Sequence, residues 1–262
     1  MFAPITSSEN PQFKAIKKLA GSARERRKTG LALLDGLHLI EAWLATGRSI
    51  EKVVFSVSGA ERPDHAAWRM VNPLIRGIVL SDPLFAQIAA IDDSVTGFLA
   101  IVETLSDEAS GCLNVDTVAL DGVQDPGNLG SILRSAVAAG FSQAVLSPEC
   151  AQVWSPKVLR AGMGAQFVLK IHEQTTLPDF LASYQGVIAV THLAGAVSLY
   201  ETPFDGPVAW VFGSEGKGVS SDVLAMATVR VRIPMVGQVE SLNVGAAAAV
   251  CLFETMRRRE SR

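Results

Sequence analysis

Three segments of the sequence combine flexible backbone with side chains that can hold or activate a ligand. The first reads LDGVQDPGNLGSILRSAVAAG over residues 120–140, where three glycines in a loop let the backbone approach a bound group closely. Asn128 places an amide near this loop, and Arg134 adds a planar, permanently charged fork on the helix that follows. Taken alone, the pattern also fits a glycine-rich turn followed by a helix with an arginine on its surface.

Two familiar nucleotide-binding motifs are absent. A phosphate-binding loop requires Lys after the second glycine of GxxxxG, but Asn128 follows Gly127, so the kinase and NTPase interpretation fails. GMGAQF, at residues 162–167, has the first two glycines of a dinucleotide fingerprint but Phe167 at the third. It also precedes a predicted strand and opens no helix, so a dehydrogenase is not favoured.

The second segment, VFGSEGKGVS at residues 211–220, again leaves a strand through glycines. Gly213, Gly216 and Gly218 surround Glu215 and Lys217, and so much flexible backbone is costly unless something docks there.

The third segment, IPMVGQVESLNVGAAAAVCLFE, covers residues 233–254. Ser241 and Asn243 stand at the start of a predicted helix whose first turn consists of small residues, which lets another helix or a flat ligand approach closely. Either residue alone also fits a simple helix cap.

The elements that position these segments form two groups. In the second half, apolar runs without strict alternation predict strands that are covered on both faces, at residues 118–120, 144–146, 187–190, 208–212 and 229–233. Such strands indicate a largely parallel sheet flanked by helices, where ligands gather at the carboxyl ends of the strands.

The first half predicts a smaller α/β unit. Asn10 followed by Pro11 starts a helix that continues to Thr29 and ends at Gly30. Strands and helices then alternate, with strands predicted at residues 31–34, 53–56, 78–80 and 98–102, and helices near 37–45 and 65–71. The polar stretch TLSDEASGCLN predicts a linker at 104–114 between domains at 1–103 and 115–262.

Basic charge is concentrated at the two ends of the chain, although the net charge is −3. The C-terminal end carries Arg257, Arg258, Arg259 and Arg262. Seven basic residues fall between positions 14 and 28 with a single acid, Glu25; these are Lys14, Lys17, Lys18, Arg24, Arg26, Arg27 and Lys28. Clustered lysine and arginine suit phosphate binding, although the pattern also fits a solvated helix face.

Other features exclude whole classes of protein. The three cysteines have no CxxC spacing, which indicates neither a disulfide framework nor a zinc site and fits a reducing cytoplasm. The histidines show no HExxH spacing, so no metal is expected. No apolar run has the length of a signal peptide or a membrane span.

The three segments together resemble the motifs of the SpoU family, also called TrmH, of RNA 2'-O-ribose methyltransferases in the SPOUT class. DGVQDPGNLGSILRSA is similar to the first motif, FGSEGKG to the second and IPMVGQVESLNVGAAAAV to the third. SPKVLRAGMGA also matches a stretch usual in these proteins, and RRKTGLALLDGLHLIEAWLATG resembles their substrate-binding domain. Asp35, where Glu is more usual, and SVTGFLAIVE, which lacks the common Pro-Gln pair, depart from the pattern and bear on the choice of substrate.

The resemblance implies a SPOUT-type parallel sheet with a C-terminal trefoil knot, preceded by a small α/β substrate-binding domain with a ribosomal-protein-like fold. General topology rules treat knots as essentially absent, so the knot follows from the resemblance alone. The knot would hold S-adenosylmethionine, the methyl donor. The implied cofactor-binding residues are Thr191, His192, Leu193, Gly213, Glu215, Gly216, Ile233, Met235, Ser241, Leu242, Asn243 and Ala246.

The implied catalytic residues are Asn128, Arg134, Glu215, Ser241 and Asn243. A guanidinium stays protonated and is a poor base, so we expect Arg134 to grip phosphate and stabilise developing negative charge, with the others orienting it or the ribose. The implied partners are tRNA or ribosomal RNA and a second copy of the chain. A catalytically silent RNA-binding protein is the alternative, and the presence of all five residues favours the enzyme.

Overall fold

The computed structural model describes residues 3–89, 96–105, 112–192, 195–238 and 241–260. These divide into two compact units, one made of Met1–Leu105 with Trp154–Arg160 and the other of Ser106–Val153 with Ala161–Arg262. Most of the predicted linker lies outside the described residues. Each unit is described by itself.

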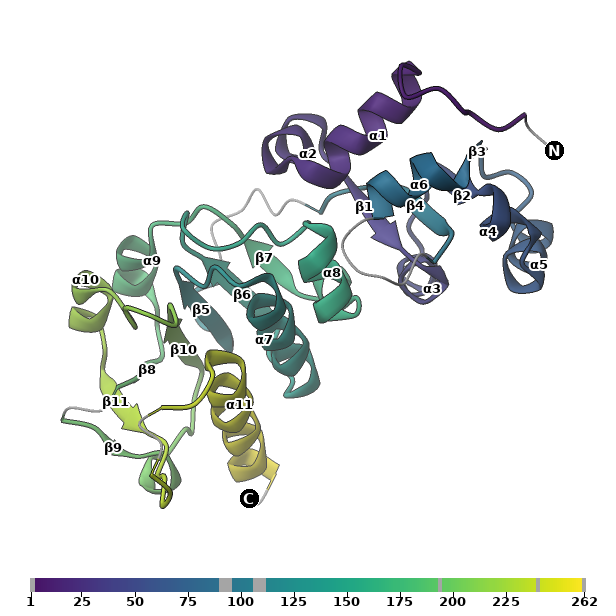
Figure 1. Cartoon of the computed structure of the whole chain (residues 1–262). Coiled ribbons are helices and arrows are strands. Elements are labelled where there is room, and N and C mark those ends of the chain that lie inside the picture. Colours follow the sequence, from purple (N-terminus) through teal and green to yellow (C-terminus); the bar gives the residue numbers. More distant parts are fainter. Residues whose placement is uncertain (1–2, 90–95, 106–111, 193–194, 239–240, 261–262) are drawn as a thin grey trace. The chain divides into compact units, whose positions relative to one another are not determined.

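The first unit is built on a mixed four-stranded sheet in the order β1-β4-β2-β3 (Figure 1). β2 and β3 run parallel, and β4 is antiparallel to both β1 and β2. The strands are β1 (Leu31–Asp35), β2 (Lys52–Ser56), β3 (Gly77–Leu80) and β4 (Phe98–Glu103). The helices are α1 (Pro11–Gly21), α2 (Ala23–Thr29), α3 (Leu37–Ala45), α4 (Val57–Glu61), α5 (Pro63–Val71) and α6 (Asp82–Ala89).

Both faces of this sheet are covered. One core cluster joins α1 and α6 to the strands, through residues such as Phe13, Phe85 and Val54. On the other face α5 packs its Trp68 against Phe98, with ring centroids 4.9 Å apart. Such burial of large apolar side chains is the main stabilising term for the unit.

The single helix predicted from Pro11 to Thr29 is wrong, because the chain forms two helices there. Asn10 caps α1 as expected, accepting hydrogen bonds from the backbone of Gln12 and Phe13. Ser22 is extended and its side chain accepts from the backbone N–H of Glu25, which starts α2. The spacing of Ser22 and Glu25 is that of a capping box, which signals a new helix.

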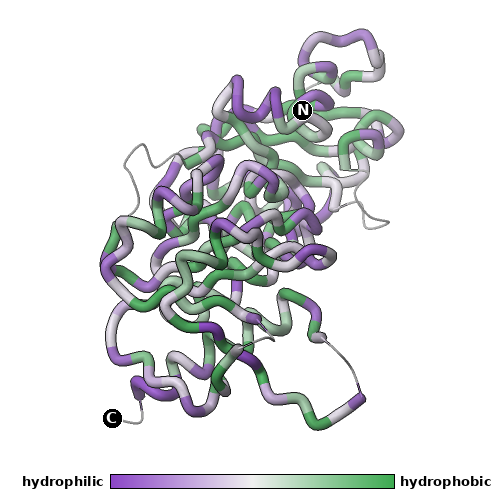
Figure 2. Tube along the Cα trace, turned by 90° about the vertical axis from the view of Figure 1, so that its left-hand side faces the viewer, coloured by the Kyte–Doolittle hydropathy of each residue, from purple (hydrophilic) through white to green (hydrophobic). Residues whose placement is uncertain are grey.

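The second unit contains a seven-stranded sheet in the order β7-β6-β5-β10-β8-β11-β9, in which every neighbouring pair is parallel, as predicted. Figure 2 colours the trace by hydropathy and shows long hydrophobic stretches (green) in its interior. The strands are β5 (Thr117–Asp121), β6 (Gln143–Leu146), β7 (Lys170–His172), β8 (Val187–Thr191), β9 (Val197–Ser198), β10 (Val208–Gly213) and β11 (Val229–Arg232).

Helices cover both faces of this sheet as well. α9 (Leu177–Ser183) and α10 (Ser221–Ala225) share a buried cluster with β5, β8 and β10. α7 (Pro126–Ala138) and α11 (Val244–Glu260) pack together on the other face (Figure 1). The short turns Ala165–Phe167 and Leu199–Glu201 also belong to this unit, whereas most of α8 (Pro156–Gly162) belongs to the first.

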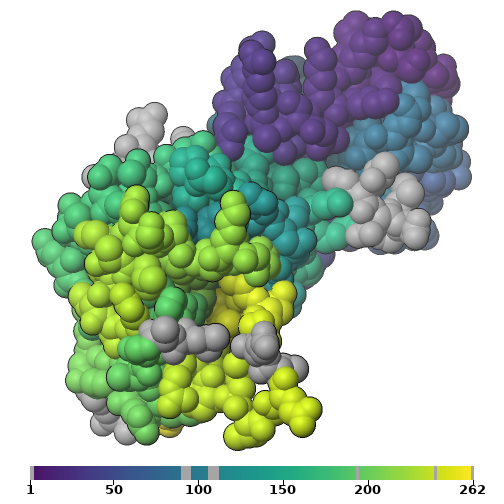
Figure 3. Space-filling model, turned by 60° about the vertical axis from the view of Figure 1, so that its left-hand side comes forward, coloured from purple at the N-terminus to yellow at the C-terminus, as the bar shows by residue number. Residues whose placement is uncertain are grey.

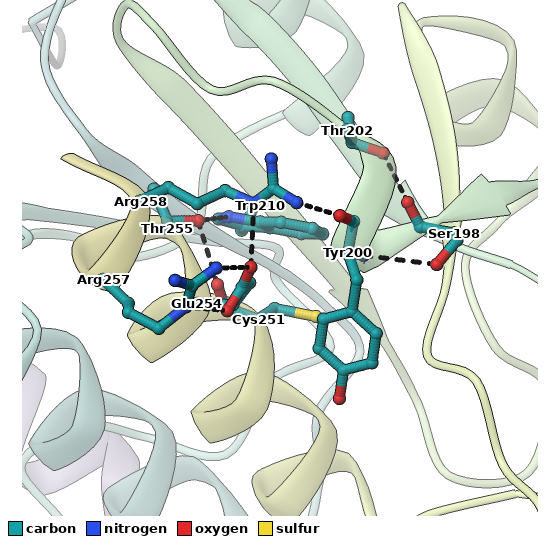
Figure 4. A network of polar contacts seen from close by, with 9 residues as sticks. All are labelled: Ser198, Tyr200, Thr202, Trp210, Cys251, Glu254, Thr255, Arg257 and Arg258. Atoms are coloured by element: carbon teal, nitrogen blue, oxygen red, sulfur yellow. Dashed lines mark hydrogen bonds and ion pairs between the residues drawn. The ribbon is translucent and has the colours of Figure 1, made fainter. Parts of the chain in front are cut away.

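The C-terminal arginines are fastened within this unit (Figure 4). Glu254, 9% exposed, accepts hydrogen bonds from Arg257 and Arg258, and Arg258 also donates to the Tyr200 carbonyl. The bond from Arg257, followed by that from Arg258, lowers the pKa of Glu254 to about 2. Arg259 pairs with both carboxylate oxygens of Asp116. These three charges therefore hold α11 in place.

Two broader findings concern the described part of the chain. It contains no helix that is both long and apolar enough to cross a membrane. Within the same residues, no group of His, Cys, Asp and Glu side chains is arranged to hold a metal ion.

Candidate active site

The first glycine-containing loop joins β5 to α7. Gly122 adopts a left-handed φ of +71°, and its backbone N–H donates to Ser147 Oγ at 3.0 Å. Asp125 caps α7 by accepting from the backbone N–H of Asn128 at 2.7 Å. Asn128 is thereby fixed, half-buried, in the first turn of a helix at the carboxyl end of the sheet.

The second loop is closed by its own backbone. Ser214 and Gly218 exchange two backbone hydrogen bonds of 3.1 and 2.9 Å. A Cβ on Gly213 would lie 2.1 Å from the carbonyl carbon of Gly218, and Gly218 itself has a φ of +68°. Two of the three glycines are thus required by the closed loop itself, so the inference that they imply a docked ligand is not needed. The loop presents Glu215 and Lys217 to solvent.

A chain of hydrogen bonds joins the three sequence motifs. Asn243 Nδ2 donates to Asn128 Oδ1 at 2.9 Å, and Asn128 Nδ2 donates to Glu215 Oε1 at 2.6 Å. Gly245, the second residue of α11, lies against this chain of bonds: a Cβ there would lie 3.1 Å from Asn243 Oδ1, closer than an ordinary contact, and 3.6 Å from Asn128 Oδ1 and Ser131 Oγ. The small residues at the start of α11 therefore serve close packing against α7.

A smaller pocket, with a cavity of about 170 Å³, lies at the carboxyl ends of β8 and β11. Six of the residues predicted to bind the cofactor line it; these are Thr191, His192, Ile233, Met235, Ser241 and Leu242. Sequence reasoning missed Val231, Arg232 and Ala247, which also line it. Their places beside the third motif were the available signal. The volume is below the roughly 300 Å³ at which ligand pockets usually begin. Only described residues are counted in its lining.

A larger pocket of about 670 Å³ lies at the carboxyl ends of β5, β6, β7 and β10. The charged residues of its described lining are mostly acidic, with Asp121, Glu149, Glu215 and Asp222 against one cation, Lys217. Sequence analysis did not predict this second pocket, because its lining comes from four separate loops.

The other predicted residues divide as follows. Glu215 and Gly216 line the larger pocket and not the smaller one. Arg134 is exposed on α7 and has no hydrogen bond or ion pair to the described residues. Ala246 lies at the start of α11, where its backbone N–H donates to Asn243. Leu193 lies outside the described residues.

The predicted RNA-binding cluster lies on α1 and α2, at the surface of its unit (Figure 3, purple). Arg26 is a correction: it is only 4% exposed, and its Nη1 donates to the carbonyls of Leu19 and Ala20. It satisfies the last carbonyls of α1 and is not available to phosphate. The other six are exposed, although Lys14 pairs with Glu9 and Lys17 bonds to Gln87.

Asp35, the departure noted in the sequence, ends β1. Its carboxylate accepts hydrogen bonds from Thr96 Oγ1 at 2.5 Å and from Arg160 Nη2 at 3.1 Å. Burial raises the pKa of this carboxyl, against the opposing effect of those two partners. Asp35 is thus held by groups of its own unit.

Comparison with known proteins agrees with this geometry. Residues 116–253 match the model of the SpoU rRNA Methylase family, and residues 10–96 match the MRM3-like substrate binding domain. A Synechocystis protein named as an uncharacterized tRNA/rRNA methyltransferase is 35% identical, over 98% of this chain and 94% of its own. The 23S rRNA (guanosine(2553)-2'-O)-methyltransferase RlmP of Bacillus subtilis is 30% identical, over 95% and 97%.

Solved structures give the same picture. An AdoMet-bound rRNA methyltransferase from Sinorhizobium meliloti has a TM-score of 0.82 and 28% identity, covering 97% of each chain. The SpoU methyltransferase AviRb from Streptomyces viridochromogenes, in complex with AdoMet, has a TM-score of 0.87 over 97% of this chain and 99% of its own. Its identity is 24%, so that likeness supports the fold alone.

Proposed function

This chain belongs to the SpoU family and is an S-adenosylmethionine-dependent RNA 2'-O-ribose methyltransferase, and from that premise we propose that it methylates ribosomal RNA beside the hydrogen-bonded residues that join its three motifs. The observation that carries this proposal is a single turn of chain. Ser241 and Leu242 line the smaller pocket, and the next residue, Asn243, bonds to Asn128. One turn thus connects a candidate cofactor pocket to the polar groups of the other two motifs.

The smaller pocket fits the methyl donor in chemistry. Val231, Ile233, Met235, Leu242 and Ala247 give it apolar walls suited to a flat aromatic base. Arg232 is the one permanently charged group in its described lining and can pair with the carboxylate of the donor. When bound, the donor supplies a methyl group on a positively charged sulfur. The trefoil knot around this pocket stays a prediction. The same holds for the cofactor roles of Leu193, Gly213, Gly216 and Ala246.

Arg134 is proposed to hold the RNA backbone beside the reacting ribose. It is exposed on the helix that begins with Asn128, and no described residue neutralises it. A guanidinium fork binds phosphate oxygens in a bidentate manner and can stabilise negative charge that develops on the ribose oxygen. Ser241, at the edge of the smaller pocket, is proposed to help position the ribose.

The remaining parts of the proposal concern partners. Ribosomal RNA is favoured over tRNA because RlmP and several RlmB relatives are named as 23S rRNA methyltransferases. The domain at 1–103 is proposed to bind RNA through α1 and α2, and the domain at 115–262 to form a homodimer. We place the activity in the cytoplasm, with its RNA.

The test is methyl transfer from radiolabelled S-adenosylmethionine to unmodified 23S rRNA transcripts. Arg134→Ala should keep the fold and cofactor affinity but lower transfer about a hundredfold or more, the usual effect of losing a positioned charged group. Arg134→Lys keeps the charge without the planar fork and should rescue little. No transfer by the wild-type chain to any RNA would support the catalytically silent alternative.

A further inference from the structure

The orientation of the Asn243 amide is fixed by backbone. Asn243 Oδ1 accepts hydrogen bonds from the backbone N–H groups of Gly245, at 2.9 Å, and Ala246, at 3.2 Å. Backbone N–H groups can only donate, so the oxygen of this amide must face α11. Its nitrogen must then face the other way, towards Asn128, to which it donates at 2.9 Å.

The same logic continues through the next residue. Asn128 receives the donated N–H on Oδ1, so its own Nδ2 faces Glu215 and donates to Oε1 at 2.6 Å. We call this chain from Asn243 through Asn128 to Glu215 the amide relay. Its direction is set by the free N–H groups at the start of a 17-residue helix and ends on a carboxylate.

Glu215 stands where such a carboxylate can act. Its side chain is exposed and lines the larger pocket, and Oε1 is the oxygen that takes the Asn128 bond, so Oε2 faces no donor of the relay. The charged groups that line the same pocket are Asp121, Glu149, Lys217 and Asp222. Asp121 Oδ2 is already occupied by the backbone N–H of Ser220, at 2.7 Å. Among the carboxylates of the described lining, Glu215 is thus the one bonded to Asn128 and, through Asn128, linked to Asn243.

We propose that the amide relay positions Glu215 to accept the proton of the ribose 2'-hydroxyl. This inference rests on the proposed function and deepens it. The 2'-O–H bond breaks, its proton goes to Glu215 Oε2, and the oxygen forms a bond to the methyl carbon. The bond from that carbon to sulfur breaks, and its electron pair stays on the sulfur. Glu215 is the catalytic residue in this scheme, and Asn128 and Asn243 are positioning residues.

The relay also explains why Arg134 need not be the base. A guanidinium stays protonated under all ordinary conditions and has no acceptor site, whereas a carboxylate accepts on both oxygens. Arg134 keeps the electrostatic task of holding phosphate. The two groups therefore take the two separate roles of proton acceptor and charge stabiliser.

The first experiment changes the acceptor in the full chain, with unmodified 23S rRNA transcripts as substrate. Glu215→Gln should lower kcat about a hundredfold or more with little change in KM, the usual scale for losing a general base. Added formate should partly restore the rate of Glu215→Ala, because it supplies a carboxylate to the vacated space. Wild-type rates in Glu215→Gln would overturn the proton-acceptor role.

The second experiment reverses the relay without removing the helix cap. Asp caps helices as well as Asn does but offers no N–H, so Asn243→Asp should keep the melting temperature while taking the donor from Asn128. Methyl transfer should fall at least tenfold, the scale of a positioning residue that acts through a general base. Asn72→Asp removes a side-chain amide donor at the end of α5, outside both the relay and the proposed RNA-binding helices, and should leave transfer unchanged.

A double mutant separates the relay from a general structural effect. If Asn243 acts through Glu215, Asn243→Asp should add nothing further in a Glu215→Gln background. Independent, multiplicative losses would overturn the relay.

A readout without turnover completes the test. In protein free of RNA, the side-chain amide NMR signal of Asn128 should shift in both Glu215→Gln and Asn243→Asp. An unmoved Asn128 signal would overturn the relay. A wild-type chain that methylates no RNA would instead overturn the proposed function, whatever the NMR result.

Discussion

The N-terminal and C-terminal basic runs look alike in the sequence but differ in the folded chain. On α1 and α2 every basic side chain except Arg26 is exposed, and Lys18, Arg24, Arg27 and Lys28 pair with none of the described residues. On α11 the arginines donate hydrogen bonds to Glu254, Asp116 and backbone carbonyls. The difference teaches that clustering alone does not show which charges can meet RNA, because acids far away in the sequence decide it.

The largest expected effect is on RNA affinity through the N-terminal run. Changing Lys18, Arg24, Arg27 and Lys28 together to Gln should weaken RNA binding about a hundredfold near physiological salt and lower the salt slope by about 3 units, since each phosphate contact contributes about 0.7–0.9. Filter binding across a salt series measures both. An unchanged slope would make the two runs alike and remove the proposed RNA surface.

Next in size is a test inside the N-terminal run. Arg26→Ala should destabilise the first unit by about 2 kcal/mol, because it leaves two carbonyls at the end of α1 without their charged donor. RNA affinity should stay the same. Its neighbour Arg27, which is exposed, is the matched control, and Arg27→Ala should leave the melting temperature unchanged. Calorimetric unfolding would distinguish the two variants.

The C-terminal run should respond with stability alone. Arg259→Ala removes bonds to Asp116 and to the carbonyls of Phe204 and Gly206, and we expect a loss of about 1–2 kcal/mol with no change in RNA affinity. Arg257→Ala, whose side chain is 60% exposed, should cost less than about 1 kcal/mol. A clear loss of RNA affinity in Arg259→Ala would show that the C-terminal run also meets RNA.

The smallest effect concerns pH. The arginines lower the pKa of Glu254 from 4.5 to about 2, so its contribution to stability is complete above pH 4.5 and is lost as the pH falls towards 2. The melting temperatures of the wild type and Glu254→Gln should therefore converge across that window. A constant difference between them would contradict the assigned pairing.

The sequence predicts the strong strands well, because buried parallel strands such as β10 are uninterrupted apolar runs. It predicts a strand after residues 162–167 without giving its bounds, where the three-residue β7 lies, and it does not predict β9, whose two residues carry no periodic signal. The short helix α4 and the helix α6 were also missed, the first because five residues cannot show a helical period. The strand order was equally out of reach, since non-local pairing has no local pattern.

The candidate site shows the same limit. The motifs identify Asn128, Glu215 and Asn243 one by one. No spacing rule predicts that Asn128 forms hydrogen bonds to Glu215, 87 positions away, and to Asn243, 115 positions away. The burial of Arg26 was likewise not predicted. The available signal was the capping box at Ser22, which marks the break between α1 and α2. Candidate site residues within one motif can be predicted from the sequence, and hydrogen bonds between distant motifs cannot.

The central position of β10 has a consequence for how the chain is made. β10 lies between β5 and β8, and its Trp210 pairs with Val118 of β5. A ribosome adds roughly 5–20 residues per second, so β5, β6 and β7 are synthesised several seconds before β10, the second neighbour of β5. Until then the edge of β5 is open to other strands, a known hazard for nascent chains. The last quarter of the chain, which carries two of the three motifs, therefore completes a sheet whose earlier strands are already made, and a product that ended before β10 would keep the exposed edge.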